Sequence, residues 1–409
     1  MRHGATAPTS SGVSRVGRPV RLTFAVAMSL LAGALVAVAP PAGATSTWSV
    51  VATPVRVDAH FDYLVGVSCP TANRCVAVGA SSDTATLAEH WDGTSWSAVP
   101  GAAGLAGAAS PTLVAVACAS ATSCFAVGHY SYPRFPSFAS AARPLVEHWD
   151  GTSWSVMTRP VPAGAREAVL TGVSCPSATS CVAVGYSWDR ALPARTLVER
   201  WDGVRWSIMN SANWSVTYLT GVSCPGATSC YAVGGVSNST SVDATAFVEH
   251  WNGKSWSIVP SPVPTGSTQS ELEHVSCPSP SSCFAVGESG AGEVSKTLVE
   301  HWNGTRWSIM PSANPTARQA SLGRVSCPST TSCVGVGAYY AARADGTLVE
   351  RTLVEQWNGR SWSITPTPNL GGATHANLSG VSCHTPTSCF AVGSRGDVQS
   401  DDPLIERYA

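Results

Sequence analysis

The sequence contains little charge. Aspartate, glutamate, lysine and arginine make up 12% of its 409 residues, and the formal net charge at pH 7 is only -1. Soluble domains usually carry about 25% charged residues. A protein that binds nucleic acid needs a basic surface to contact the phosphates, and no basic cluster is present. We therefore expect no nucleic-acid partner.

Long apolar runs are absent after the first 44 residues, where no stretch approaches the roughly 20 apolar residues that span a bilayer. Residues 1–44 themselves combine Arg15, Arg18 and Arg21 with an apolar run over 22–40 and a small-residue exit at 42–44. This order is typical of a secretory signal peptide, whereas a retained anchor is the alternative. We expect a signal peptide over 1–44 and a secreted, extracellular product without a membrane anchor.

Helical periodicity is also lacking, and a repeated unit of short β-branched segments takes its place. The unit reads G-V-S-C-P-x-x-x-x-C-x-A-V-G, then a variable stretch, then L-V-E-H-W-[DN]-G-x-x-W-S-I, and it begins anew every 49 to 57 residues. Periods near 50 are typical of four-stranded propeller blades. Asp-Gly and Asn-Gly are strong hairpin signals because glycine accepts the positive φ of the turn. Each unit is therefore predicted to form strands A, B, C and D.

The two ends of the chain complete each other. The last unit stops after its C strand, at Tyr408, and the segment "STWSVV" beginning at Ser46 is a D strand with no unit before it. Pairing of the two closes a ring and leaves no open sheet edge. The sequence predicts an all-β fold, a seven-bladed β-propeller of four-stranded antiparallel blades. Residues 45–409 form this single domain, with 45–57 as the closing D strand and 58–409 as seven repeats; an open solenoid is the alternative.

All fourteen cysteines belong to the repeat, at one spacing. In a secreted chain they are expected to be oxidised, and a cysteine at each foot of a five-residue hairpin suits a disulfide. Zinc binding is the alternative, but the spacing is wider than that of usual zinc sites. We expect no metal and no cofactor. The predicted pairs are Cys69 and Cys75, Cys118 and Cys124, Cys175 and Cys181, Cys224 and Cys230, Cys277 and Cys283, Cys327 and Cys333, and Cys383 and Cys389.

Residues present in every unit are expected to serve the blade. Twelve of the fifteen tryptophans form W-x-x-x-x-W hairpins, and Trp48 faces Tyr408 in the closing blade; sugar stacking is their alternative role. The repeated glutamate of strand C and the histidine that often follows it lie on separate blades. Carboxylates that act as acid and base must converge in one site. We expect instead that they form hydrogen bonds between neighbouring blades.

The stretches "YAVGG" (231–235) and "FVEHWNGKSWSIVPSP" (247–262) resemble the kelch-type repeat, which also builds the central domain of galactose-oxidase-like propellers. This resemblance covers essentially all of residues 45–409. It implies a propeller with a binding role and carries over no catalytic residue. The cysteine pair in each unit is a departure from the kelch pattern.

Length variation is confined to the connections between strands B and C and between D and A, which lie on one face of an antiparallel blade. The B–C stretches range from 7 to 16 residues. Such insertions commonly form a binding surface, and clustered aromatics with arginine are typical of recognition sites. Packing of the loops onto the scaffold is the alternative role. The candidate ligand-binding residues in these connections are Trp188, Trp214, Tyr130, Tyr132, Tyr186, Tyr218, Tyr339, Tyr340, Arg134, Arg190 and Arg343.

These features favour a monomeric, secreted, non-catalytic recognition scaffold that binds an extracellular glycan or protein. An extracellular propeller hydrolase or lyase acting on polysaccharide is the alternative, and a self-assembling coat component is a third possibility. No recognisable catalytic constellation exists, so no catalytic residue is assigned. The candidate acidic and imidazole residues outside the repeat include Asp189, Glu271, Glu273, His129, His274 and His375.

Overall fold

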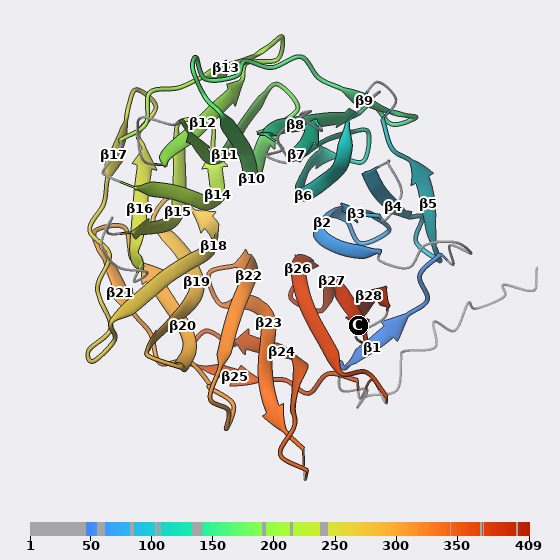
Figure 1. Ribbon diagram of the computed structural model, residues 1–409, viewed down its shortest axis with the longest axis vertical. Coiled ribbons are helices and arrows are strands. Elements are labelled where there is room, and N and C mark those ends of the chain that lie inside the picture. The colour runs from blue at the N-terminus through green and yellow to red at the C-terminus, as the bar shows by residue number, and fades with distance from the viewer. Residues whose placement is uncertain are drawn as a thin grey trace, which may run out of the picture. The chain divides into compact units, whose positions relative to one another are not determined.

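The computed structural model describes residues 46–54, 62–81, 86–102, 105, 108–132, 141–189, 194–212, 216–237, 244–343, 345–368, 370, 372–397 and 400–409. Within these ranges the strands form seven antiparallel sheets of four, arranged as blades around an axis (Figure 1). The predicted seven-bladed β-propeller is therefore confirmed. The described residues contain no helix that is long and apolar enough to cross a membrane. The expected signal peptide lies outside them.

Each blade runs outward from the axis in the order A, B, C, D. The A strands are β2 (Tyr63–Thr71), β6 (Ala109–Ser120), β10 (Glu167–Ser177), β14 (Thr217–Gly226), β18 (Gln269–Ser279), β22 (Ala320–Ser329) and β26 (His375–Thr385). The B strands are β3 (Arg74–Ala80), β7 (Ser123–Tyr132), β11 (Ser180–Trp188), β15 (Ser229–Ser237), β19 (Ser282–Ala291), β23 (Ser332–Ala342) and β27 (Ser388–Gly396). The C strands are β4 (Thr86–Trp91), β8 (Ala141–Trp149), β12 (Arg195–Trp201), β16 (Ala244–Trp251), β20 (Val294–Trp302), β24 (Leu348–Trp357) and β28 (Asp401–Tyr408). The D strands are β5 (Trp96–Pro100), β9 (Trp154–Val156), β13 (Trp206–Ile208), β17 (Trp256–Ile258), β21 (Trp307–Ile309), β25 (Trp362–Ile364) and β1 (Trp48–Val51). We number the blades 1 to 7 from β2 to β26.

The ring is closed by the N-terminal strand. β1 pairs antiparallel with β28, with Trp48 opposite Tyr408 and Val51 opposite Ile405. The rings of Trp48 and Tyr408 lie 5.4 Å apart between centroids. β2 of blade 1 packs against β26 of blade 7, so the innermost strands also form a complete circle. The closure inferred from the truncated last unit is confirmed.

The hydrophobic core lies between adjacent blades. Each cluster of buried side chains combines residues from two neighbouring sheets. In one of them Phe125 of blade 2 packs against Trp201 and Trp206 of blade 3, at 5.3 and 5.5 Å between ring centroids. Large aromatic side chains at this radius fill the space that widens as the blades diverge from the axis. The tryptophan hairpins therefore stabilise blade packing.

A disulfide joins strands A and B in every blade. The seven bonds link the predicted pairs, with Cα atoms 3.9 to 4.1 Å apart, and no cysteine is left free. Closing so short a loop stabilises the fold by about 2 kcal/mol per bond in the chain-entropy model. Disulfides persist only in oxidising compartments. The cysteine pattern thus points to an oxidising environment, as extracellular proteins experience.

The repeated glutamate of strand C is buried, and in blades 2, 4, 5 and 6 it accepts a hydrogen bond from the preceding blade. Thr86 of blade 1 donates to Glu147 of blade 2 at 3.0 Å, and Ser211 of blade 3 donates to Glu249 of blade 4 at 2.9 Å. The same contact recurs from Ser261 to Glu300 and from Ser312 to Glu355. The repeated histidine contacts strand B of its own blade, as in His301, whose Nε2 lies 3.1 Å from Ser282 Oγ. The expected hydrogen bonds between blades are thus present for Glu147, Glu249, Glu300 and Glu355, whereas Glu199 and Glu406 form none within the described residues. The histidines of blades 2, 4 and 5 bond within their own blade.

A ring of serines connects the A strands. In six blades, the serine that precedes the first cysteine accepts a hydrogen bond from the next blade. The donor is the backbone N–H of the first cysteine of that next blade. The accepting serines are Ser68, Ser174, Ser223, Ser276, Ser326 and Ser382, and the distances are 2.9 to 3.0 Å. Blade 2 carries Ala117 at this position, so the ring is interrupted between blades 2 and 3.

Replacing Ala117 with serine should complete the ring. The new hydroxyl can accept from the N–H of Cys175, and an intramolecular hydrogen bond contributes about 0.5 to 1.5 kcal/mol. We expect the free energy of unfolding to rise by that amount in urea titrations. Ser223→Ala is the matched control and should lower it by a similar amount. A decrease for Ala117→Ser would show that this seam has no room for the hydroxyl.

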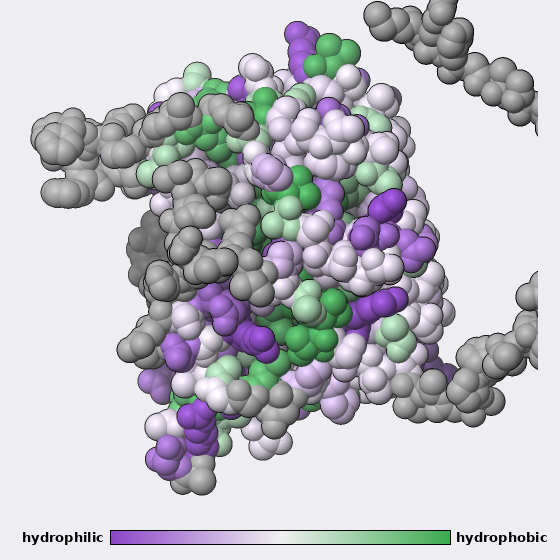
Figure 2. All heavy atoms as spheres, turned by 90° about the vertical axis from the view of Figure 1, so that its right-hand side faces the viewer, coloured by the Kyte–Doolittle hydropathy of each residue, from purple (hydrophilic) through white to green (hydrophobic). Residues whose placement is uncertain are grey.

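The outer surface reflects the low charge of the sequence. On the flank of the ring that faces the viewer in Figure 2, most residues have intermediate hydropathy. Strongly hydrophilic and strongly hydrophobic side chains form small separate groups there (Figure 2). The side chains that distinguish one blade from another lie instead on the faces of the ring and along its axis.

Candidate functional site

The two faces of the ring differ in the predicted way. The A–B and C–D turns share one face, because a Cβ added to Gly93 in a C–D turn would lie 3.2 Å from the Asn73 side chain in an A–B turn. The C–D turns are alike: Asp92 Oδ1 accepts from the backbone N–H groups of Thr94 and Ser95, at 2.7 and 2.8 Å. The B–C and D–A connections lie at the opposite ends of the strands, and we call their side the variable face.

Four of the candidate ligand-binding residues lie, wholly or with their side chains, outside what the structure describes. Trp214, Arg134 and Arg190 lie outside the described residues, and Tyr132 is described only as the last residue of β7. The others are Trp188, Tyr130, Tyr186, Tyr218, Tyr339, Tyr340 and Arg343. They are distributed over blades 2, 3, 4 and 6. The structure therefore does not bring them together in one patch, and each candidate has its own surroundings.

Trp188 offers the most accessible aromatic surface. It ends β11, 40% of its surface is exposed, and the Arg166 guanidinium lies 5.6 Å from its ring centroid. The Arg166 N–H also donates to the Trp188 carbonyl at 2.8 Å, which fixes the strand end. The indole lines a cavity of about 360 Å³ together with Asp189, Arg195 and Asn210. We call this the Trp188 pocket; it combines an apolar ring with polar groups of both charge signs.

The remaining candidates are more enclosed. Tyr130 packs against the core between blades 1 and 2, and Tyr339 against the core between blades 5 and 6. Burial raises the pKa of Tyr186. Tyr340 is 40% exposed, and Arg343 donates through Nη2 to the Ala373 carbonyl at 3.4 Å. Of these, only Tyr340 combines an exposed ring with a position on the wall of a cavity.

A second polar group on the variable face consists of carboxylates in blade 5. Glu271 on β18 and Glu288 on β19 are cross-strand partners, and Tyr218 of blade 4 hydrogen-bonds to Glu271. Burial, opposed by Tyr218, raises the pKa of Glu271, and burial raises that of Glu273 to about 7. The sequence indicated Glu271 and Glu273 as candidates but not Glu288, the cross-strand partner of Glu271, because pairing register is invisible until strands are aligned.

The other acidic and imidazole residues outside the repeat do not join this group. Asp189 lines the Trp188 pocket, and His129 on β7 has its pKa lowered by burial. His375 pairs with Asp401 across blade 7. Among the described residues no group of three or more His, Cys, Asp or Glu side chains is arranged to hold a metal ion.

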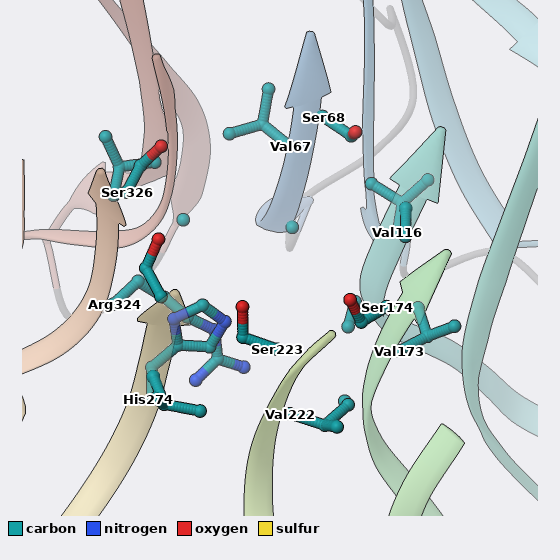
Figure 3. Close-up of a pocket in the computed structure, with 18 of the residues that line it drawn as sticks. Val67, Ser68, Val116, Val173, Ser174, Val222, Ser223, His274, Arg324 and Ser326 are labelled. Atoms are coloured by element: carbon teal, nitrogen blue, oxygen red, sulfur yellow. The ribbon is translucent and has the colours of Figure 1, made fainter. Parts of the chain in front are cut away.

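The axial channel contains the remaining unusual pair. A cavity of about 250 Å³ is lined by the seven A strands, and His274 and Arg324 lie on its wall beside Ser223 (Figure 3). Burial, together with the positive charge of Arg324, lowers the pKa of His274 to about 3, so the imidazole is neutral at neutral pH. Sequence reasoning noted His274 but missed Arg324. The available signal was the glycine of the G-V-S-C motif, which arginine replaces only at 324.

No family model matches the chain, and no curated protein matches it. Solved structures do. The chain is similar to YCF48 bound to D1 peptide, with 13% identity and a TM-score of 0.53 over 90% of this chain and 99% of that one. YCF48 from Cyanidioschyzon merolae is similar at 12% identity and a TM-score of 0.51, over 88% of this chain and 98% of that one.

A third similar structure is the GH74 xyloglucanase from Xanthomonas campestris, at 13% identity and a TM-score of 0.50. The match covers 88% of this chain but 55% of the xyloglucanase, so the chain spans about half of that protein. At such low identity these similarities show the fold alone. They agree on a β-propeller.

Proposed function

We propose that this protein is a secreted, non-catalytic recognition scaffold that binds an extracellular glycan or protein through the variable face. The observation that carries the proposal is the Trp188 pocket. An exposed indole supplies a large apolar contact, and the neighbouring guanidinium, carboxylate and amide groups supply directional hydrogen bonds. Cavities of a few hundred Å³ with this mixture are typical ligand sites.

The scaffold favours recognition over catalysis for a physical reason. The disulfide in each blade and the buried hydrogen bonds between several neighbouring blades hold the strands rigidly, while sequence differences between blades are concentrated on the variable face. A rigid support lowers the entropy that a binding surface loses when its ligand docks. The kelch-type resemblance and the signal-peptide pattern support the same function. We propose that the secreted protein acts as a monomer.

The similar structures support both ligand classes. One of them is bound to a peptide, and another is a xyloglucanase, which acts on a polysaccharide. Because the similarity shows the fold alone, the choice between glycan and protein rests on the Trp188 pocket. Flat aromatic rings beside polar groups suit a sugar ring, whose apolar face stacks while its hydroxyls hydrogen-bond.

Replacing Trp188 with alanine should weaken ligand binding at least tenfold, because central aromatic contacts cost about 2 kcal/mol or more when truncated. The measurement is a pull-down of the oxidised protein on insoluble polysaccharides and bacterial cell walls. Ile364→Ala is the control, since that side chain is 42% exposed on the outermost strand β25. Retention of the mutant at wild-type levels would exclude the pocket as the anchor. Binding to a protein target alone, lost in the mutant, would select the protein class.

A polysaccharide hydrolase or lyase is the second candidate function, favoured by the paired carboxylates of blade 5. Glu271 and Glu288 face each other across β18 and β19, and burial raises the pKa of Glu271 as a general acid requires. If this function holds, Glu271→Gln should abolish turnover of a polysaccharide that the wild type cleaves. A screen of glycoside and polyuronate substrates that shows no turnover by the wild type would remove this candidate.

A further inference from the structure

On the innermost strand of each blade, the residue just before the V-S-C motif distinguishes blades 5 and 6 from the other blades. From blade 1 to blade 7 the residues are Gly66, Ala115, Gly172, Gly221, His274, Arg324 and Gly380. Small residues are needed where neighbouring A strands approach: a Cβ on Gly221 would lie 2.9 Å from the His274 Cα, and one on Gly380 would lie 2.6 Å from the Val65 carbonyl oxygen. His274 and Arg324 therefore depart from the packing rule that the other blades obey.

Arg324 lacks a close counter-charge. Its Nη1 donates to the Gly323 carbonyl at 3.1 Å, and within the described ranges no carboxylate forms an ion pair with it. Glu273 acts on it only from a longer distance and does not line the cavity. A guanidinium has five N–H donors and is usually paired when it is withdrawn from bulk water. Among the described residues Gly323 is the one acceptor of its donors, and the side chain lines the channel.

His274 restricts the charge of a ligand that can occupy the channel beside Arg324. Its Nδ1 lies 3.2 Å from the Val325 carbonyl oxygen, which holds the ring against blade 6. The ring lies beside the Arg324 side chain (Figure 3), whose positive charge lowers the pKa of the imidazole. A second cation between these two groups would be repelled. An anion would be attracted by Arg324 and would favour a proton on His274.

Serine hydroxyls complete the wall. Ser223, Ser276 and Ser326 line the same cavity, and their Oγ atoms already accept hydrogen bonds from the next blade at 3.0 Å. A hydroxyl that accepts through oxygen still has its own proton to donate. In Figure 3 the hydroxyls of Ser223 and Ser326 and the Arg324 side chain are drawn around one space. Convergent donors with one positive charge are the chemistry of an oxyanion site.

We propose that the axial channel binds a small oxyanion, such as phosphate, sulfate or a carboxylate, through Arg324 and the serine hydroxyls beside it. The site is independent of the variable-face ligand, because its residues lie on the A strands at the axis and share none with the Trp188 pocket. A cavity of about 250 Å³ holds several water volumes and therefore admits these ions.

The test is isothermal titration of the full secreted protein with sodium phosphate, sodium sulfate and sodium acetate at one ionic strength, against a chloride background. Wild type should bind one oxyanion per chain. Arg324→Gly, which installs the residue found in blades 1, 3, 4 and 7, should bind it at least tenfold more weakly, as expected for loss of charge-assisted hydrogen bonds. Arg205→Ala, at a side chain that is 81% exposed, is the matched control and should bind like the wild type.

Thermal unfolding shows that the variant is folded and gives a second readout. Phosphate should raise the Tm of the wild type more than that of Arg324→Gly, because only a bound ligand adds linked stability beyond the general salt effect. Saturable binding of phosphate and sulfate assigns an inorganic anion, and binding of acetate alone assigns a carboxylate group. Equal affinity in wild type and Arg324→Gly, or no oxyanion binding by the wild type, would overturn the proposal.

Discussion

Replacing Trp48 with alanine should lower the free energy of unfolding by about 3 to 5 kcal/mol, the range for large aromatic side chains removed from a core. The indole is 5% exposed and packs with Val334 of blade 6 and Leu404 of blade 7. In the other blades a short turn ties the corresponding strand to strand C. β1 is joined to the rest of the chain only through blade 1, so its side-chain packing carries more of the closure.

Urea unfolding followed by tryptophan fluorescence and circular dichroism measures this effect. Val50→Ala is the matched control, because Val50 lies on the same strand and is 41% exposed; its cost should stay within about 0.5 kcal/mol. Trp206→Ala provides a comparison in blade 3, where the buried tryptophan lies on a D strand that a short turn connects to strand C. If Trp48→Ala costs no more than Val50→Ala, β1 does not hold the ring closed in solution.

The fold could be read from the sequence because its determinants repeat. Cysteine pairs at a single spacing mark the same strands in all seven blades and Asp-Gly or Asn-Gly turns do so in six, and the missing D strand of the last unit matches the extra one at Trp48. Repetition averages out the local ambiguity that limits predictions for single strands. The hydrogen bonds that Glu147, Glu249, Glu300 and Glu355 form between blades followed from the same reasoning, since a group that recurs in the blades is expected to serve blade packing.

The sites were harder to predict because they depend on differences between blades. Aromatic residues in variable connections look alike in sequence, but Trp188 is exposed whereas Tyr130 packs into a core. The partnership of Glu271 with Glu288 depends on strand register, which includes a bulge between Leu272 and His274. A bulge shifts every later partner by one residue, and nothing in the repeat announces it.

The protein should also lose stability as the pH rises from about 6.5 to 8. Five repeated glutamates have their pKa raised to about 7 by burial: Glu147, Glu199, Glu249, Glu300 and Glu406. In the unfolded chain they titrate near 4.5. The folded state therefore binds more protons than the unfolded state in this interval, and stability falls with increasing pH wherever that is so. The stability of these groups is present at low pH and is lost as the pH passes through about 7.

The histidines determine the lower limit of the pH range in which the dependence of stability on pH can be assigned to the glutamates. Burial lowers the pKa of His90 to about 4 and lowers those of His148, His250 and His301. Buried neutral histidines have the opposite effect, since they cost stability as the pH falls below their unfolded pKa of about 6.5. Near pH 6.5 the histidines of the unfolded chain are still half protonated, so they offset part of the glutamate loss at the lower end of the window; from about pH 7.5 upward they are neutral in both states and the slope reports the glutamates. Each glutamate should contribute about 1 kcal/mol of loss between pH 6.5 and 8.

Glu406→Gln isolates one of these groups. Within the described residues neither carboxylate oxygen of Glu406 has a hydrogen-bond partner, so the ionised form gains nothing there to offset the loss of water. The neutral amide keeps the shape and should remove about 1 kcal/mol of the loss between pH 6.5 and 8, measured by urea unfolding at several pH values. Asp402→Asn, at an exposed position of the same strand, should leave the slope unchanged. A wild-type stability that is flat or rises across this window would mean that the glutamates are ionised in the folded ring and that water or a cation reaches the seams between blades.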